Sequence, residues 1–402
     1  MHGLMQDYKL VVPTIIDHAA LNHADQVVVT RGVEDGAIRR ITYEAINRNA
    51  RLCSSGLQEL GMKKGDRIAT MAWNTDHHLE AWYGIMGIGA VCHTVNPRLF
   101  PEQIIYIINH AEDRVVFTDT TFLPIFEKLI DQLPTVEHFI VLTDKDHLPE
   151  TSLKNVHSYV EWRDQQKDGF SWVDVDENDA CGLCYTSGTT GNPKGVLYSH
   201  RSNILHGLIA GTKDTIGFSA ADTILPVVPM FHANAWGITF GAPMAGSKMV
   251  FPGMQMDGAS IHELLETERC SHAAAVPTVW LMLLQHLQAS GAKISTLKQV
   301  LIGGSAVPEK IVRTFLEDYG VETIHAWGMT EMSPIGTIAS PLPGFDELSK
   351  DDQMAYRLKQ GRTPWGVEMK IVDEAGKTLP RDGKTPGRLL VRGPAVVHRY
   401  FR

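Results

Sequence analysis

Residues 185–195, YTSGTTGNPKG, combine three residue types that suit the binding of a phosphate. Glycines allow backbone N–H groups to approach an anion closely, hydroxyl side chains add hydrogen-bond donors, and Lys194 adds a positive charge that can follow a triphosphate. A Gly- and Thr-rich surface turn is the alternative interpretation. We predict a phosphate-binding loop formed by Thr186, Ser187, Gly188, Thr189, Thr190, Gly191 and Lys194.

This segment differs from the common phosphate-binding loop of nucleotide hydrolases. That motif has glycine directly before its lysine and Ser or Thr after it, whereas Lys194 stands between Pro193 and Gly195. The apolar runs on both sides predict a strand before the loop and another after it. The phosphate donors would then come from the loop itself rather than from a helix N-terminus. The sequence therefore argues against a P-loop kinase or ATPase.

Three further stretches follow in order: PMFHANAWG at 229–237, GGSAVP at 303–308 and HAWGMTE at 325–331. Together with the predicted phosphate loop, they resemble the signature motifs of the acyl-adenylate-forming superfamily. This superfamily includes acyl-CoA synthetases, luciferases and the adenylation domains of peptide synthetases. VVPMFHANAW and GGSAVP are most similar to the motifs of medium- and long-chain fatty-acid CoA ligases.

The resemblance implies a role for two aromatic side chains of the first stretch. His232 would lie beside the substrate carboxylate and the α-phosphate, where an imidazole can donate a hydrogen bond to oxygen. Trp236 matches a tryptophan that gates the acyl tunnel in the long-chain ligases. A histidine satisfied within the core and a tryptophan that simply packs there are the alternatives.

The other two stretches would hold the nucleotide. The resemblance assigns the turn at 303–306 to adenine, Thr330 to the α-phosphate, and Glu331 with Thr186 to Mg²⁺, which prefers oxygen ligands. Trp327 stands where the family usually has tyrosine, and His325 replaces Gln or Asn, which changes any hydrogen bond from those positions. The implied nucleotide-binding residues here are Gly303, Gly304, Ser305, Ala306, His325, Ala326, Trp327, Gly328, Met329 and Thr330, and the implied catalytic residues are Lys194, His232, Thr330 and Glu331.

The resemblance implies a two-step reaction that uses ATP, Mg²⁺ and coenzyme A. A fatty-acid carboxylate attacks the α-phosphorus, pyrophosphate leaves, and the thiol of coenzyme A then displaces AMP from the acyl-adenylate. Two alternatives stay open: a CoA ligase for a short methylthio-acid such as methylmercaptopropionate, and a non-catalytic nucleotide- or acyl-binding module. The family continues into a mobile C-terminal domain that carries the adenylation lysine, whereas this sequence stops at VVHRYFR. We therefore expect a truncated chain with impaired adenylation.

Strands and helices must alternate around these motifs to position them. Short apolar runs and amphipathic stretches alternate from about residue 67 to residue 328, which predicts an α/β fold with two mostly parallel, helix-covered sheets. Thr42 is a candidate cap for a helix that follows it, and Asp35-Gly36 is a candidate hairpin turn. We expect subdomains at 1–175 and 176–336. Residues 337–402 predict a small β-barrel-like subdomain that ends before the family's hinge.

Composition narrows the partners and the surroundings. The net charge of −9 and the lack of a basic block argue against nucleic acid as the main partner. The five cysteines do not predict a disulfide framework, although Cys181 and Cys184 form a CxxC that a redox or zinc site would also use. The N-terminus does not resemble a signal peptide and no apolar run has the length of a membrane span, so we expect a cytoplasmic protein. The resemblance also implies a possible homodimer.

Overall fold

A computed structural model describes the chain except for His2 and residues 187–190. Within the described residues, a seven-stranded sheet has the order β7-β6-β5-β3-β4-β8-β9, and all its neighbours are parallel except β8 and β9. Its strands are β3 (Arg67–Met71), β4 (Val91–Thr94), β5 (Val115–Thr118), β6 (His138–Val141), β7 (Val156–Ser158), β8 (Ala180–Tyr185) and β9 (Gly195–Ser199). The predicted parallel sheet is therefore present.

A second sheet of eight described strands has the order β15-β14-β13-β12-β10-β11-β1-β2 and is antiparallel only at its two edges. Its strands are β1 (Val27–Arg31), β2 (Ile38–Thr42), β10 (Thr223–Pro226), β11 (Lys248–Phe251), β12 (His272–Ala275), β13 (Gln299–Ile302), β14 (Glu322–Gly328) and β15 (Ile335–Ile338). The antiparallel pair β1–β2 flanks the hairpin turn expected at Asp35-Gly36.

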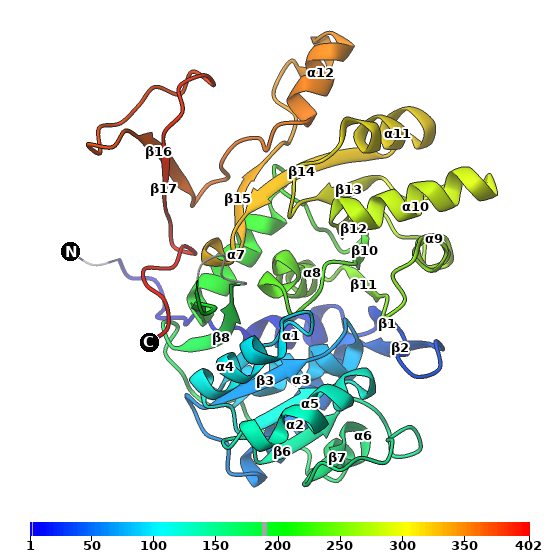
Figure 1. Ribbon diagram of the computed structural model, residues 1–402, viewed down its shortest axis with the longest axis vertical. Coiled ribbons are helices and arrows are strands. Elements are labelled where there is room, and N and C mark those ends of the chain that lie inside the picture. Colours follow the sequence, from blue (N-terminus) through cyan, green and yellow to red (C-terminus); the bar gives the residue numbers. More distant parts are fainter. Residues whose placement is uncertain (2, 187–190) are drawn as a thin grey trace.

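Helices cover both faces of each sheet (Figure 1). One core cluster packs α1, α2, α3, α7 and α8 between the two sheets, while α4 and α5 cover the outer face of the first sheet and α9, α10 and α11 that of the second. The α-helices are α1 (Pro13–Asn22), α2 (Tyr43–Glu59), α3 (Asp76–Gly87), α4 (Pro101–Ala111), α5 (Leu123–Leu129), α6 (Tyr159–Asp164), α7 (His200–Gly211), α8 (Ile238–Ala245), α9 (Gly258–Thr267), α10 (Pro277–Ser290), α11 (Glu309–Tyr319) and α12 (Lys350–Arg357).

Burial on both faces explains why the central strands are almost uninterrupted apolar runs. In β5, Val115 and Phe117 face the core between the sheets, whereas Val116 faces α4 and α5. Local signals position the helices: the Thr42 hydroxyl accepts a hydrogen bond from the Ala45 N–H at 3.2 Å, which confirms it as the cap of α2. The predicted α/β fold is confirmed.

The region after residue 337 differs from the expectation in one respect. Its strands β16 (Glu368–Val372) and β17 (Arg388–Arg392) are short and antiparallel as predicted, but among the described residues they form a two-stranded sheet of their own. Closing a barrel requires a larger set of tilted strands than this pair provides. The pair stands apart from the two large sheets (Figure 1).

Each of the two large sheets contains strands from both sides of the boundary expected at residue 175. β1 and β2 belong to the second sheet, and β8 and β9 belong to the first. The boundaries at 175 and 336 stay predictions. None of the described helices combines the length and the apolar character that crossing a membrane requires.

Candidate active site

The predicted phosphate loop connects β8 to β9. Tyr185 pairs with Gly195 in the antiparallel ladder, so the strand–loop–strand arrangement is confirmed. At the base of the loop the Thr186 N–H donates to the Lys194 carbonyl oxygen at 2.9 Å, and the Lys194 N–H donates to the Thr186 hydroxyl at 3.4 Å. These two bonds fix both ends of the loop. The predicted residues Ser187, Gly188, Thr189 and Thr190 lie outside the described residues.

The loop that carries His232 leaves the second sheet after β10 and is held by Asn74, a residue of the segment that follows β3. The buried Asn74 side chain donates to the carbonyl oxygens of Pro226 and Val228, both at 2.8 Å, and its Oδ1 accepts from the Met230 N–H at 2.7 Å. Three hydrogen bonds of one side chain therefore connect the segment after β3 to the loop after β10, beside His232.

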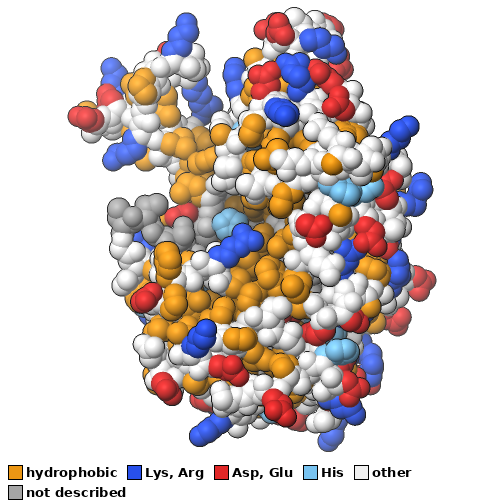
Figure 2. Space-filling view, turned by 45° about the vertical axis from the view of Figure 1, so that its right-hand side comes forward, with side chains coloured by type: hydrophobic (Ala, Val, Ile, Leu, Met, Phe, Trp, Pro, Cys, Tyr) orange, Lys and Arg blue, Asp and Glu red, His pale blue; other side chains and the backbone are white. Residues whose placement is uncertain are grey.

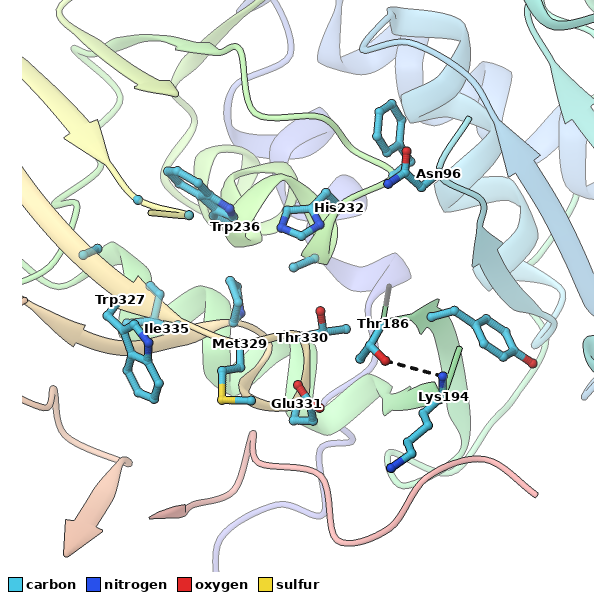
Figure 3. A pocket seen from close by; sticks show the side chains of 18 of the residues that line it. Asn96, Thr186, Lys194, His232, Trp236, Trp327, Met329, Thr330, Glu331 and Ile335 are labelled. Carbon is cyan, nitrogen blue, oxygen red and sulfur yellow. Dashed lines mark hydrogen bonds between the residues drawn. The ribbon is translucent and has the colours of Figure 1, made fainter. Parts of the chain in front are cut away.

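A left-handed turn follows His232. The five residues Ala233–Gly237 have φ values of 45°, 59°, 48°, 57° and 80° in succession. L-residues disfavour this conformation, and a run of it requires support from the surroundings. Trp236 is buried within the turn, and the Asn234 carbonyl oxygen accepts from the Thr239 hydroxyl at 3.2 Å. The turn directs His232 and Trp236 into the same cavity (Figure 3).

Gly303, directly after β13, brings backbone to the cavity wall. A Cβ atom at Gly303 would lie 3.1 Å from the Trp236 ring and 3.3 Å from the Ala326 carbonyl oxygen, closer than ordinary contact. The missing side chain therefore provides the space in which the indole packs.

Two more glycines shape the wall around the end of β14. A Cβ at Gly336 would lie 2.6 Å from the Trp327 ring, and a Cβ at Gly328 would lie 2.0 Å from the Pro334 carbonyl oxygen. Gly336 thus gives the Trp327 indole a flat backbone to lie against, and Gly328 admits a backbone approach that no other residue would allow.

Thr330 and Glu331 begin the short 3₁₀ helix Thr330–Met332. The Tyr198 hydroxyl donates to the Thr330 carbonyl oxygen at 2.7 Å, and the Val397 N–H donates to the Glu331 carbonyl oxygen at 2.8 Å. The Tyr400 hydroxyl donates to Oε1 of Glu331 at 2.7 Å, and this bond raises the pKa of Tyr400 to about 12. Backbone and side chain of Glu331 are therefore both fixed.

These parts surround one cavity of about 570 Å³. His232 and Trp236 face Thr330 across its open middle (Figure 3). The structure places most of the predicted site residues on the lining, namely Thr186, Lys194, His232, Trp236, Gly303, Gly304, Ala326, Trp327, Gly328, Met329, Thr330 and Glu331. Gly191, Ser305, Ala306 and His325 are not on it.

His325 is buried away from the cavity. Its Nδ1 lies 3.2 Å from the carbonyl oxygen of Leu358, just after α12, and burial lowers the pKa of its imidazole. A neutral ring can donate one hydrogen bond to that carbonyl. The structure therefore gives His325 a partner in the protein and does not place it with the other predicted nucleotide-binding residues.

His232 is exposed to the cavity, and its electrostatic surroundings favour the neutral ring. Burial lowers the pKa of His232, and the nearby positive charge of Arg98 lowers it further. A neutral imidazole has one N–H donor and one acceptor nitrogen. His232 can thus donate a hydrogen bond to a substrate oxygen at neutral pH.

Sequence reasoning missed several lining residues, among them Asn96, Phe231 and Tyr400. It also missed Asn74, which lies outside the cavity but fixes the loop of His232. Apolar lining residues give no signal beyond their hydrophobicity. Tyr400 follows the last strand by eight residues, and only the fold shows that it reaches Glu331.

The site and the fold match one known family. A family model described as AMP-binding enzyme matches residues 16–401. The chain belongs to this family. A 3-methylmercaptopropionyl-CoA ligase of Ruegeria lacuscaerulensis is 47% identical over 100% of this chain and 74% of its own length. A medium-chain-fatty-acid–CoA ligase of Ectopseudomonas oleovorans is 48% identical over 100% of the chain and 73% of its own length. A long-chain-fatty-acid–CoA ligase of Thermus thermophilus is 40% identical over 99% and 71%.

Solved structures agree on the fold. An anthranilate CoA ligase, AuaEII, in complex with anthranoyl-AMP superposes with a TM-score of 0.84 at 23% identity, over 98% of this chain and 73% of that one. The N-terminal domain of FACL13 from Mycobacterium tuberculosis gives a TM-score of 0.82 at 22% identity, over 98% and 91%. The predicted family and the enzyme class, a CoA ligase, are confirmed. The relatives are named for different acids, so their names agree on the class of enzyme but not on the acid.

The donor groups in the cavity fit a magnesium ion that arrives with a nucleotide. The Glu331 carboxylate and the hydroxyls of Thr186 and Thr330 line the same space. No cluster of three or more His, Cys, Asp or Glu side chains suited to a metal occurs in the described part of the chain. Mg²⁺ is commonly held by one or two carboxylates together with substrate phosphates rather than by a cage of protein ligands. The CxxC cysteines are free and buried, which leaves the redox and zinc interpretations without support.

Proposed function

We propose that this chain activates a medium- to long-chain fatty acid with ATP and passes the acyl group to coenzyme A. One observation carries the proposal: the ends of the phosphate loop, His232, Thr330 with Glu331, and an apolar wall all border one cavity. A reaction between a carboxylate and a nucleotide phosphate needs these four features in one place.

The protein's part in the first step is alignment and charge neutralisation. His232 donates a hydrogen bond to the carboxylate or to an α-phosphate oxygen and holds the two reactants in line. The Thr330 hydroxyl donates to the α-phosphate from the opposite wall, and Lys194 lies with the pyrophosphate end of the nucleotide. Glu331 and Thr186 would hold Mg²⁺, which when bound neutralises phosphate charge. No covalent bond to the enzyme is required.

The adenine would lie against the wall formed by residues 303–304 and 326–329. Backbone without side chains at Gly303 and Gly304 can approach a flat base closely, and the Trp327 indole can stack on it. An indole has no phenol oxygen, so any hydrogen bond made by a tyrosine at this position is absent here. A protein with Tyr at residue 327 should therefore bind AMP differently.

The apolar wall supports an aliphatic acid. Five apolar side chains line the cavity that His232 also lines, namely Phe231, Trp236, Leu301, Ile335 and Ile338. Hydrophobic side chains also gather over the hollowed middle of one face of the molecule (Figure 2). Their burial of methylene groups contributes about 0.8 kcal/mol for each CH₂ that leaves water. A longer acid therefore gains affinity as far as the wall extends.

A short methylthio-acid is the second candidate. The relatives named for 3-methylmercaptopropionate and for medium-chain fatty acids match this chain equally well, at 47% and 48% identity. Comparing kcat/KM for octanoate with that for 3-methylthiopropionate separates the two. A ratio above 10 in favour of octanoate supports the fatty-acid proposal, and a ratio below 1 contradicts it.

Formation of octanoyl-AMP tests the chemistry. We would incubate the chain with ATP, Mg²⁺ and octanoate and measure the adduct by mass spectrometry, using Lys194→Ala and Glu331→Gln as site variants. Glu317→Gln on α11 is a control, because this exposed carboxylate pairs only with Arg313 among the described residues. Adduct that requires both site residues but not Glu317 supports the proposal. Nucleotide binding without adduct from any acid would favour the non-catalytic binding module.

Three predictions about the whole protein stay proposals. The subdomain boundaries near 175 and 336 can be tested by limited proteolysis, and the possible homodimer by sedimentation at several protein concentrations. The expected cytoplasmic location can be tested by fractionating cells of the source organism.

A further inference from the structure

Tyr400 lies at the edge of the cavity between two residues of the proposed site. Its hydroxyl donates to Oε1 of Glu331 at 2.7 Å. The Nζ atom of Lys194 lies 5.1 Å from the centre of its ring, within the range of a cation–π interaction. One side chain from the last residues of the chain therefore contacts both Glu331 and Lys194.

The backbone around Tyr400 is held independently of its side chain. The Val397 N–H donates to the Glu331 carbonyl oxygen and the Phe401 N–H donates to the Gly195 carbonyl oxygen, both at 2.8 Å. Phe401 and Gly195 form an antiparallel bridge at the start of β9. Substituting the Tyr400 side chain should consequently leave the segment in place.

The hydrogen bond restricts the Glu331 carboxylate to one orientation. Oε1 is engaged by the Tyr400 hydroxyl, while Oε2 has no hydrogen-bond partner within the described part of the chain. A carboxylate fixed in this way keeps Oε2 available for a cation and loses less rotational freedom when it binds one.

We propose that Tyr400 is a positioning residue that orients the Glu331 carboxylate for Mg²⁺ and steadies the Lys194 ammonium beside it. The inference rests on the proposed function, because it takes Glu331 as the magnesium ligand. Groups that hydrogen-bond to a metal ligand typically change metal affinity by about 10–100-fold when they are removed.

The hydroxyl and the ring can be tested separately. Tyr400→Phe keeps the ring over Lys194 and removes only the bond to Glu331, whereas Tyr400→Leu removes both contacts. Tyr8→Phe is the matched control, since Tyr8 is 69% exposed near the N-terminus. We would measure ATP binding by calorimetry in EDTA and across a Mg²⁺ titration, which reports on metal and nucleotide without any turnover.

For Tyr400→Phe we expect the Mg²⁺ concentration at half-maximal effect to rise about tenfold, with ATP affinity in EDTA unchanged. For Tyr400→Leu we expect the same rise and, in addition, about two- to fivefold weaker ATP binding in EDTA, because a cation–π interaction at a partly exposed site contributes roughly 0.5–1 kcal/mol. Tyr8→Phe should match the wild type in both measurements.

An unchanged Mg²⁺ midpoint in Tyr400→Phe would overturn the inference, and so would a lower midpoint, which would mean that the hydroxyl competes with the metal. Glu331→Gln distinguishes this failure from failure of the proposed function. If Glu331→Gln abolishes the Mg²⁺ effect while Tyr400→Phe does not change it, only the role of Tyr400 is wrong. If Glu331→Gln also binds ATP with a normal Mg²⁺ response, the metal assignment of Glu331 is wrong and the inference about Tyr400 falls with it.

Discussion

Replacing Asn74 by alanine should destabilise the protein and loosen the loop of His232 in one step. The side chain is 3% exposed and makes three hydrogen bonds of 2.7–2.8 Å to the backbone that follows β10. It lies three residues after β3, so the bonds connect the segment that leaves the first sheet to the loop that leaves the second. Alanine removes all three and leaves the Met230 N–H without the acceptor described for it.

The magnitude follows from these contacts. Each hydrogen bond contributes about 1 kcal/mol net, and a buried N–H left without a partner costs about 1–3 kcal/mol more. The sum is about 4–6 kcal/mol, comparable with much of the roughly 5–15 kcal/mol that stabilises a typical domain. Asn74→Asp keeps the volume and the acceptor for Met230 but places an oxygen against two carbonyl oxygens, so we expect a loss of similar size.

Urea denaturation followed by tryptophan fluorescence measures the loss, and equilibrium binding of AMP and of octanoate measures the effect on the site. We expect octanoate affinity to fall more than AMP affinity, because Asn74 holds the loop of His232 rather than the loop of Lys194. Asn178→Ala is the control, since this exposed amide bonds only to Asp176 among the described residues. A change below about 1 kcal/mol for Asn74→Ala, or an equal loss for both ligands, would refute the reasoning.

Three further substitutions test other parts of the structure. Gly328→Ala should lower the free energy of unfolding by about 3 kcal/mol or more, because its Cβ would lie 2.0 Å from the Pro334 carbonyl oxygen; a normal urea midpoint would contradict this. Burial raises the pKa of Asp119 to about 8, so the wild type loses stability as the pH rises from about 4 through 8 and the buried carboxyl must ionise. Asp119→Asn has no carboxyl to ionise there. Urea titrations should therefore show that the stability of Asp119→Asn relative to the wild type is greater at pH 8.5 than at pH 5. Trp236→Ala should raise kcat/KM for dodecanoate relative to octanoate by removing the ring that packs at Gly303, and an unchanged ratio would argue against Trp236 as a gate.

Local patterns in the sequence predicted most of the fold. Apolar runs of strand length become buried strands, and Thr42 caps the helix that follows it, as its side-chain hydroxyl predicts. Residues of all four motifs line one cavity, because the loops after β8, β10, β13 and β14 open onto it. Signals of this kind depend on residues only a few positions apart, so they can be recognised in a single sequence.

Other features depend on contacts between distant segments and were not predictable. Asn74 and Tyr400 act on backbone and side chains far from them in the chain, and no periodicity reveals such pairs. The left-handed turn at Ala233–Gly237 contains only one glycine. Its four other residues also have positive φ, which their residue types do not predict. His325 belongs to a recognisable motif, yet its Nδ1 lies 3.2 Å from the carbonyl oxygen of Leu358, 33 residues further along the chain.

The exchange of strands between the two sheets has a consequence for how the chain folds as it is synthesised. β1 lies between β2 and β11 in the second sheet, so the hairpin of β1 and β2 lacks its other neighbour until Lys248–Phe251 have been synthesised. The first sheet likewise has an unpaired edge at β4 until β8 and β9 have been synthesised. Pairing of such distant segments requires closure of long loops and slows folding. A nascent chain halted before β11 should therefore expose an unpaired strand edge, the kind of surface that chaperones bind.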